Sequence, residues 1–236
     1  MNFGVAVLNT FKGLRDKIDL LDRVVLEAER LGFDCILLTD HFMLPWSSES
    51  LETWTYLSYV AAKTSNLKFG SCVTPIAFRP PSLLAKIVST LDLLSKGRVI
   101  VGVGSGWYQP EFEAYSQWDN ASVRVEKTGE GVELMIKLWT EDKVNFKGKY
   151  YLVKDAVLEP KPIQKPYPPI WFGSNPKPGN RMLKLTAQLG DGWIPLGPRW
   201  ASTYTTPEAY KEAVRKIQLE MKTLKRHNKM TYACLM

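Results

Sequence analysis

The feature of this sequence that most constrains its fold is a regular alternation of short apolar runs with segments of helical period. Four runs, at residues 2–8, 33–39, 67–76 and 98–104, are apolar almost throughout. Strands that read as continuous apolar runs are typical of parallel sheets covered on both faces. The pattern therefore predicts a parallel α/β fold, either a (β/α)8 barrel or a doubly wound sheet.

Helices are predicted between these runs. Apolar residues from Ile18 to Leu31 fall at helical spacing, and Gly32 supplies a C-terminal stop. Ser50 is expected to cap a second helix. Prolines open a third helix, which Gly97 ends.

The middle of the chain interrupts this rhythm. Residues 104–120 are predicted to form a polar, aromatic loop that is too long for an ordinary connector. A helix, a hairpin turning at Lys147-Gly148 and a proline-rich connector are expected after it. We therefore expect an insertion at about residues 105–168, after the fourth strand.

Regular alternation then resumes with strands at 169–174, 191–196 and 230–236 and helices between them. The strands expected in total are one fewer than an eight-stranded barrel has. The prediction is thus a TIM-type (β/α)8 barrel, one domain over residues 1–236, apparently without its final βα unit. An open sheet edge of this kind favours a homodimer.

Composition narrows the class of protein. No apolar run approaches the roughly 20 residues of a membrane helix, and the first residues lack the pattern of a signal peptide. Cys35, Cys72 and Cys234 are widely spaced, which fits intracellular thiols better than disulfides. We expect a cytoplasmic protein with no membrane contact.

The net charge of +7 is compatible with nucleic acid, an anionic cofactor or a basic solvated surface. Much of the excess lies in the predicted helix at 206–229, where no aromatic residues interleave for base stacking. The pattern favours a solvated helix face over nucleic-acid binding.

Ligands of parallel α/β folds bind at the carboxyl ends of the strands. His41, one of two histidines in the chain, follows the second predicted strand directly after Asp40. It is either an acid-base group or a histidine that bonds a backbone carbonyl. Asp40 need not orient it, because consecutive strand residues point to opposite faces. Glu111 and Glu113 are weaker acid candidates, and no pattern of metal ligands is present.

Two glycine-containing segments also lie at strand ends. "VGVGSGW" lacks the spacing of a dinucleotide loop, and close approach of the backbone to a flat ligand is the favoured interpretation. "WFGSNPKPGNRMLK" places small residues before a helix, where free N–H groups could bind a phosphate. An ordinary N-cap by Ser174 or Asn180 explains the second segment equally well.

Several long segments together resemble the luciferase-like superfamily of flavin monooxygenases and deazaflavin oxidoreductases, across nearly the whole chain. They are "AERLGFDCILLTDHF", "FGSCVTPIAFRPPSLLAK", "STLDLLSKGRVIVGVGSGWYQPEFEAY", "RVEKTGEGVELMIKLWTEDKVNFKGKYY", "PKPIQKPYPPIWFGS" and "LGDGWIP". This resemblance implies a TIM barrel with an insertion after strand four. It also implies a cofactor, coenzyme F420 or FMN, at the carboxyl ends of the strands.

The resemblance further implies roles for particular residues. Asp40 and His41 would be the catalytic residues, with Asp40 against the cofactor ring and His41 facing the substrate as acid-base group. "FGSCVT" matches a bulge that supports the ring, with a cis peptide at Cys72–Val73. The cofactor-binding residues expected are Asp40, Ser71, Cys72, Val73, Thr74, Gly104, Gly106, Gly173, Ser174, Asn175 and Gly192.

The segments "TDHF" and "GSCVT" are more similar to the deazaflavin branch, and a basic protein suits an anionic cofactor tail. We therefore expect F420-dependent hydride transfer to or from a small organic substrate. The alternatives are an FMNH2-dependent monooxygenase and a non-catalytic flavin-binding protein.

Overall fold

The computed structural model describes residues 2–175, 181–196 and 206–233. Its main sheet is eight-stranded, with the order β1-β2-β3-β5-β8-β9-β10 and with β4 paired to β5. Every neighbouring pair in this sheet is parallel. The strands are β1 (Gly4–Val7), β2 (Cys35–Leu38), β3 (Lys68–Ser71), β4 (Thr74–Pro75), β5 (Val99–Gly104), β8 (Ile170–Ser174), β9 (Gly192–Pro195) and β10 (Thr231–Tyr232).

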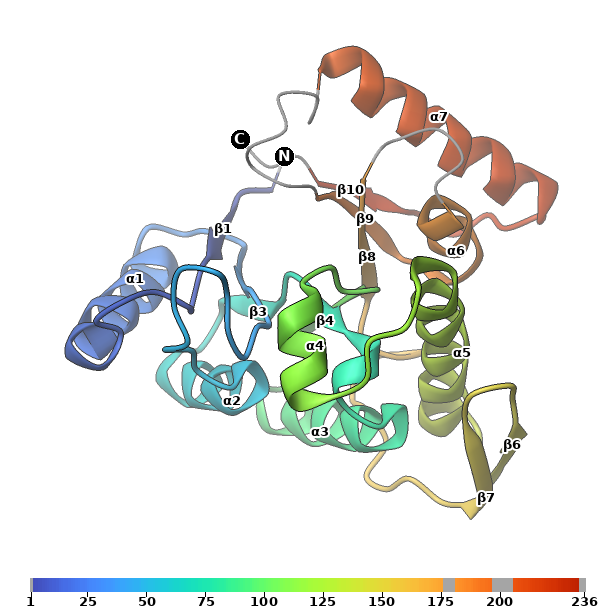
Figure 1. The fold of residues 1–236 in the computed structure, drawn as a ribbon, viewed down its shortest axis with the longest axis horizontal. Helices are drawn as coiled ribbons and strands as arrows, with labels where there is room; N and C mark the ends of the chain where they lie inside the picture. The colour runs from blue at the N-terminus through green and yellow to red at the C-terminus, as the bar shows by residue number, and fades with distance from the viewer. Residues whose placement is uncertain (1, 176–180, 197–205, 234–236) are drawn as a thin grey trace.

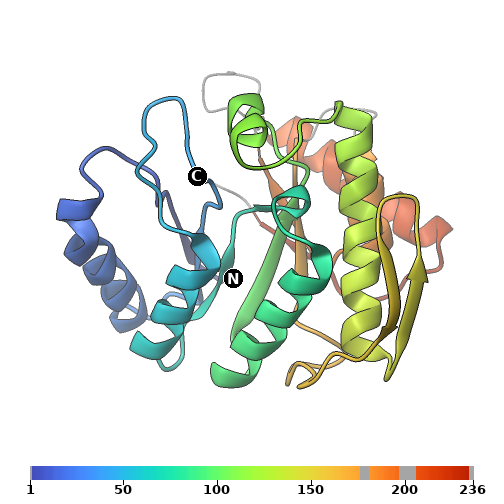
Figure 2. The ribbon, with the colours of Figure 1, turned by 60° about the horizontal axis from the view of Figure 1, so that its bottom comes forward.

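The helices follow one another around the outside of this curled sheet (Figure 1). They are α1 (Ile18–Arg30), α2 (Thr53–Lys63), α3 (Pro81–Leu94), α4 (Gln109–Tyr115), α5 (Ala121–Thr140), α6 (Arg181–Leu189) and α7 (Pro207–Thr223), with short 3-10 turns η1 (Arg15–Lys17) and η2 (Ile76–Phe78). Figure 2 shows α1, α2, α3 and α5 in a row against the sheet, with α4 set apart at one end. In the described residues, no helix is both long and apolar enough to cross a bilayer.

The side chains of the strands alternate between two faces. In β2, Ile36 and Leu38 pack into the large cluster that the sheet shares with the helices. Leu37 between them belongs to a separate cluster with Cys72, Ile100 and Ile194, built from strands and strand ends. The helices thus cover one face and the other face forms an interior, which is the barrel arrangement and not the doubly wound one.

The third predicted strand is divided in two. The run 67–76 forms β3 and β4, and the peptide bond between Cys72 and Val73 at their junction is cis, as expected. The pairings of β3 and β4 with β5 place both pieces beside the same neighbouring strand.

Two local expectations were wrong. The segment 104–120 is not wholly a loop, because it contains α4, with Pro110 in the first turn. Ser50 does not cap α2; the cap is Glu52, whose carboxylate accepts a hydrogen bond from the Thr55 N–H at 2.6 Å. The expected hairpin is confirmed as β6 (Val144–Lys147) and β7 (Leu152–Ala156).

Glu29 joins α1 to the turn before β3. Its Oε1 accepts hydrogen bonds from the backbone N–H groups of Ser65, Asn66 and Leu67 at 2.8, 2.6 and 3.0 Å. Burial raises the pKa of Glu29, but the three donors outweigh it, so the pKa is lowered from its ordinary 4.5. A lowered pKa contributes stability above the unfolded-state pKa, and that contribution is lost as the pH falls through the folded value.

We therefore expect Glu29→Gln to lower the free energy of unfolding by about 1 kcal/mol at neutral pH, since the group is largely solvated. The difference from wild type should shrink below about pH 4.5. Urea unfolding across pH tests this, with Glu133→Gln on the exposed face of α5 as control. A deficit that stays constant with pH would contradict the carboxylate's role.

Candidate active site

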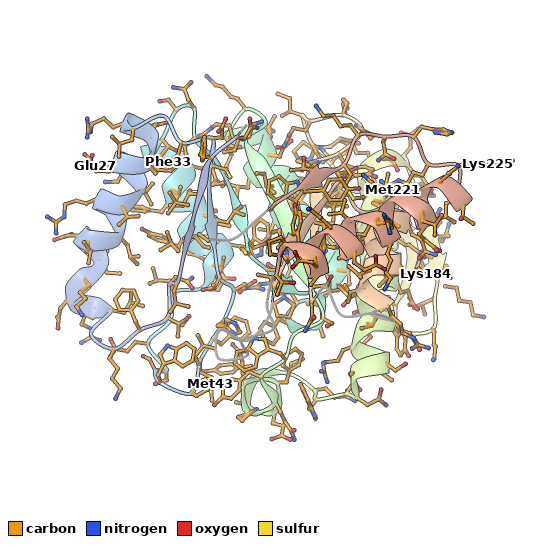
Figure 3. All side chains as sticks on the ribbon, turned by 90° about the horizontal axis from the view of Figure 1, so that it is seen from above. Glu27, Phe33, Met43, Lys184, Met221 and Lys225 are labelled. Atoms are coloured by element: carbon orange, nitrogen blue, oxygen red, sulfur yellow. The ribbon has the colours of Figure 1, made fainter. Side chains whose placement is uncertain are left out.

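The candidate site begins at the carboxyl end of β2, where His41 meets a buried carboxylate. The Nδ1 atom of His41 lies 2.8 Å from Oε2 of Glu111 in α4. The other oxygen of Glu111 accepts the backbone N–H groups of Phe42 and Met43, at 2.5 and 3.2 Å. The Glu111 side chain is fully buried, whereas 14% of the His41 side chain is exposed. Figure 3 shows Met43 beside α4, at the end of the sheet where the two segments meet.

Asp40 has a different environment from the expected one against a cofactor ring. Its carboxylate is fully buried and binds Arg79 through both oxygens, with N···O distances of 2.7 and 3.0 Å. The hydroxyl of Thr74 donates to it at 2.7 Å and accepts from the Trp54 indole N–H at 3.0 Å. Both carboxylate oxygens are thus already engaged, and Asp40 is not the partner of His41.

Arg79 carries the positive charge of this network. It binds Glu52 as well as Asp40, and 9% of its side chain is exposed. Burial lowers the pKa of the guanidinium, but the two carboxylates outweigh burial and the pKa is raised. The pKa of Glu52 is lowered, because the Thr55 hydrogen bonds and Arg79 together outweigh its burial. The ion pairs of Arg79 with Asp40 and Glu52 therefore anchor Asp40, the residue directly before His41.

A small apolar platform lies at the ends of the neighbouring strands. Val73, which is partly exposed, stands among glycines whose missing side chains leave it room. A Cβ atom on Gly104 would lie 2.5 Å from a Val73 methyl, and one on Gly173 would lie 2.7 Å from the other methyl. Only glycine fits beside Val73 at these two positions, and the surface so formed suits a flat ring.

Aromatic side chains wall the site on the side of α4. The ring of Trp107 meets the His41 imidazole edge-on, with centroids 5.9 Å apart, and 48% of Trp107 is exposed. Phe42 stacks on Phe78 at 4.8 Å and contacts Tyr115 at 5.0 Å. Trp107 thus lies directly beside the imidazole, and the other rings form an aromatic cluster on the segment that follows it.

The predicted phosphate turn is described only in part. Ser174 ends β8, is buried, and accepts the Trp193 indole N–H at 3.0 Å. The described part of α6 begins at Arg181, so an N-cap by Ser174 is not tested by the described residues. Asn180, the other candidate cap, lies outside the described residues. Phosphate binding by Gly173, Ser174 and Asn175 stays a prediction.

Three further predicted residues, Ser71, Cys72 and Gly106, have structural roles in the described part of the chain. Ser71, fully buried, donates its hydroxyl to the Gly102 carbonyl at 2.7 Å, so it ties two strands together. Burial, with a smaller contribution from Cys35, raises the pKa of the Cys72 thiol to about 12, so this cysteine packs as an apolar residue. Gly106, with a φ of 73°, makes the turn that leads to Trp107.

The expected position of Gly192 was wrong. This residue begins β9 and pairs with Trp171, whereas the carboxyl end of β9 is Pro195, opposite Ser174. A Cβ atom there would meet the Trp171 indole at 2.5 Å, so the glycine is explained by packing. The strand was recognised in the sequence at 191–196, but Gly192, which lies at its start, was placed among the residues at its carboxyl end.

Two residues of the site were underrated or missed. Glu111 stood only as a weaker candidate, although Pro110 before it is a helix-start signal that could have placed it on a helix. Arg79 was overlooked, and its local sequence holds no signal, because its partner Asp40 is 39 residues away. Among the described side chains, no group of three or more His, Cys, Asp or Glu could hold a metal ion.

Comparison with known proteins identifies the family that this chain resembles. Residues 1–233 match the family model described as luciferase-like monooxygenase. An F420-dependent glucose-6-phosphate dehydrogenase of Amycolatopsis mediterranei (strain U-32) is 34% identical over 192 residues, covering 79% of this chain and 56% of that protein. An FMNH(2)-dependent dimethylsulfone monooxygenase of Pseudomonas putida is 30% identical over 167 residues, covering 70% of this chain and 46% of that protein.

Among solved structures, an F420-dependent secondary alcohol dehydrogenase in complex with an F420-acetone adduct superposes with a TM-score of 0.82. It is 26% identical, and the match covers 98% of this chain and 67% of that one. The chain spans about half the length of the curated relatives it matches. The expected family resemblance and the barrel class of the fold are confirmed.

Proposed function

This chain belongs to the luciferase-like monooxygenase family, and from that premise we propose that it takes part in F420-dependent hydride transfer to or from a small organic alcohol or carbonyl compound. The observation that carries the proposal is the His41–Glu111 pair, 2.8 Å apart, at the end of the strand next to the one that leads to Val73. An imidazole there can exchange a proton with a substrate oxygen.

The residues at the strand ends fit a flat cofactor ring. Val73 would support the ring, while Gly104 and Gly173 leave the space beside Val73 that larger residues would fill. Gly173, Ser174 and Asn175 are the residues that we propose for the phosphate. Coenzyme F420, when bound, supplies the site that accepts or gives the hydride.

The protein's own groups would handle the proton and the geometry. His41 takes the hydroxyl proton when an alcohol is oxidised and returns it when a carbonyl is reduced. Arg79 and Asp40 hold the segment that carries His41, so we now propose a positioning role for Asp40 in place of ring contact. Trp107 lies directly beside the imidazole.

The relatives favour F420 over FMN. Several F420-dependent glucose-6-phosphate dehydrogenases are 31–34% identical to this chain over most of its length. One observation supports the second candidate, an FMNH2-dependent monooxygenase: the dimethylsulfone monooxygenase is 30% identical. The aromatic ring beside His41 and the alcohol dehydrogenase that shares the fold support the proposed substrate class, a small alcohol or carbonyl compound.

Turnover with a substrate panel tests this function. Secondary alcohols, sugar phosphates and sulfones would be offered to the protein with F420, and separately with FMNH2 and oxygen. We expect F420 reduction by an alcohol or a sugar phosphate. Oxygen consumption with FMNH2 alone would establish the second candidate, and binding without any turnover would establish a non-catalytic flavin-binding protein.

The Val73 platform yields a more specific prediction. Val73→Asp should weaken F420 binding about tenfold or more, because a carboxylate would be desolvated beneath an apolar ring. Val157→Asp, at a surface valine that is 61% exposed, is the matched control and should bind normally. Fluorescence titration measures both, and equal affinities of the two variants would contradict the platform.

The assembly and surroundings of the protein are further proposals. We propose a homodimer with a cytoplasmic location and no nucleic-acid partner, on the sequence evidence given above. Light scattering at several protein concentrations tests the dimer, and a monomer at all of them would refute it.

A further inference from the structure

We propose that Glu111 is the positioning residue that fixes the tautomer of His41, keeping the proton on Nδ1 and a lone pair on Nε2. The catalytic consequence of this arrangement rests on the function proposed above. The tautomer itself is a property of the protein alone and can be observed without cofactor or substrate.

The argument starts from the hydrogen-bonding capacity of the carboxylate. The Oε1 atom of Glu111 faces two backbone N–H groups, those of Phe42 and Met43, so it can only accept. The Oε2 atom faces Nδ1 of His41 at 2.8 Å. An ionised carboxylate has no proton to give, so Nδ1 must be the donor. A fully buried carboxylate needs such donors, and three are supplied here.

The surroundings hold both partners in place. The hydroxyl of Ser50 donates to the His41 carbonyl, and Phe42 stacks on Phe78. On the other side, Phe112 is fully buried next to Glu111 and contacts Phe78 at 4.6 Å, which fixes α4 against the same cluster. The imidazole therefore has little freedom to turn away from the carboxylate.

With Nδ1 occupied, Nε2 is the nitrogen left for a substrate. With an alcohol bound, Nε2 would take the O–H proton as the C–O bond becomes C=O, and F420, when bound, would supply the acceptor for the hydride from the carbinol carbon. The imidazolium so formed keeps its Nδ1–H on Glu111, whose negative charge offsets the new positive charge. Carbonyl reduction reverses each of these transfers.

Glu111→Gln reverses this polarity with almost no change in shape. The amide oxygen would stay with the two backbone N–H groups, which need an acceptor, so the NH2 group would face Nδ1. Nδ1 must then accept, and the proton moves to Nε2, where a lone pair is needed. We expect turnover to fall by about 10²- to 10⁴-fold with F420 binding retained.

Nitrogen-15 NMR of histidine-labelled protein reads the tautomer directly. The chain has two histidines, and His227→Gln in the exposed segment after α7 leaves the His41 signals alone for assignment. For the neutral imidazole of the wild type we expect a protonated Nδ1 and a bare Nε2. Glu111→Gln should exchange the two. Glu113→Gln, on the same helix and bonded to Gln109, is the matched control and should change neither.

The outcomes separate this inference from the function. A wild-type spectrum with the proton on Nε2 would overturn the inference, even if Glu111→Gln does not fold. The expected spectra without turnover on any substrate would support the positioning role and refute the proposed function. A flipped tautomer with unchanged turnover would overturn the catalytic consequence.

Discussion

Replacing His41 by Gln should lower the proposed F420-dependent turnover by about 10²- to 10⁴-fold, the range expected when a general acid-base group is removed. The imidazole is partly exposed beside Trp107 and is held by a buried carboxylate, an environment that fits the proposed proton-transfer role. Glutamine fills similar space and can still accept or donate hydrogen bonds, but it cannot carry the proton.

The effect should be confined to the chemical step. F420 affinity should stay within about twofold of wild type, because the predicted cofactor contacts lie at Val73 and the glycines beside it. His227→Gln, which removes the chain's other histidine, is the control and should turn over normally. Unchanged turnover in His41→Gln would show that the proton is handled by another group.

Replacing Arg79 by Met should lower the free energy of unfolding by about 3–5 kcal/mol, because it leaves a buried carboxylate without its partner. Asp40 is fully buried, and Arg79 binds both of its oxygens. Thr74 would remain as a donor, but one hydroxyl does not balance a buried charge. Urea unfolding at neutral pH measures the loss.

Two further variants test whether the loss of stability comes from leaving the buried Asp40 carboxylate without its partner. Adding Asp40→Asn to Arg79→Met should recover at least half of the lost stability, since the charge is gone from both partners. Arg30→Met removes an exposed pair with Glu27 and should leave the free energy of unfolding nearly unchanged. A cost for Arg79→Met no larger than that for Arg30→Met would contradict the role of the buried pair.

Much of the fold was predictable because its signals are local. The apolar run at 33–39 and the helix ending at Gly32 could be recognised from spacing alone, and the structure has β2 and α1 there. The alternation of strand side chains also indicated that Asp40 need not orient His41. In the structure Asp40 forms an ion pair with Arg79, and His41 forms a hydrogen bond with Glu111.

The identity of those partners was not predictable, because contacts across a barrel leave no local pattern. Glu111 is 70 residues from His41 and was assigned to a loop, so nothing in its neighbourhood pointed back to β2. Gly192 was misplaced for a different reason: it lies near the start of the strand predicted at 191–196, but it was counted among the residues at that strand's carboxyl end. The strand ends could be listed from the sequence, but which groups meet there depends on the order and curl of the whole sheet.

The most direct test of the central claim is a titration of the protein with F420 and, separately, with FMN, followed by absorbance and fluorescence. We predict that F420 binds at least about tenfold more tightly than FMN, a difference of about 1.4 kcal/mol or more. Val73→Asp should abolish that preference. Tight binding of FMN with weak or no binding of F420, or no binding of either, would contradict the account.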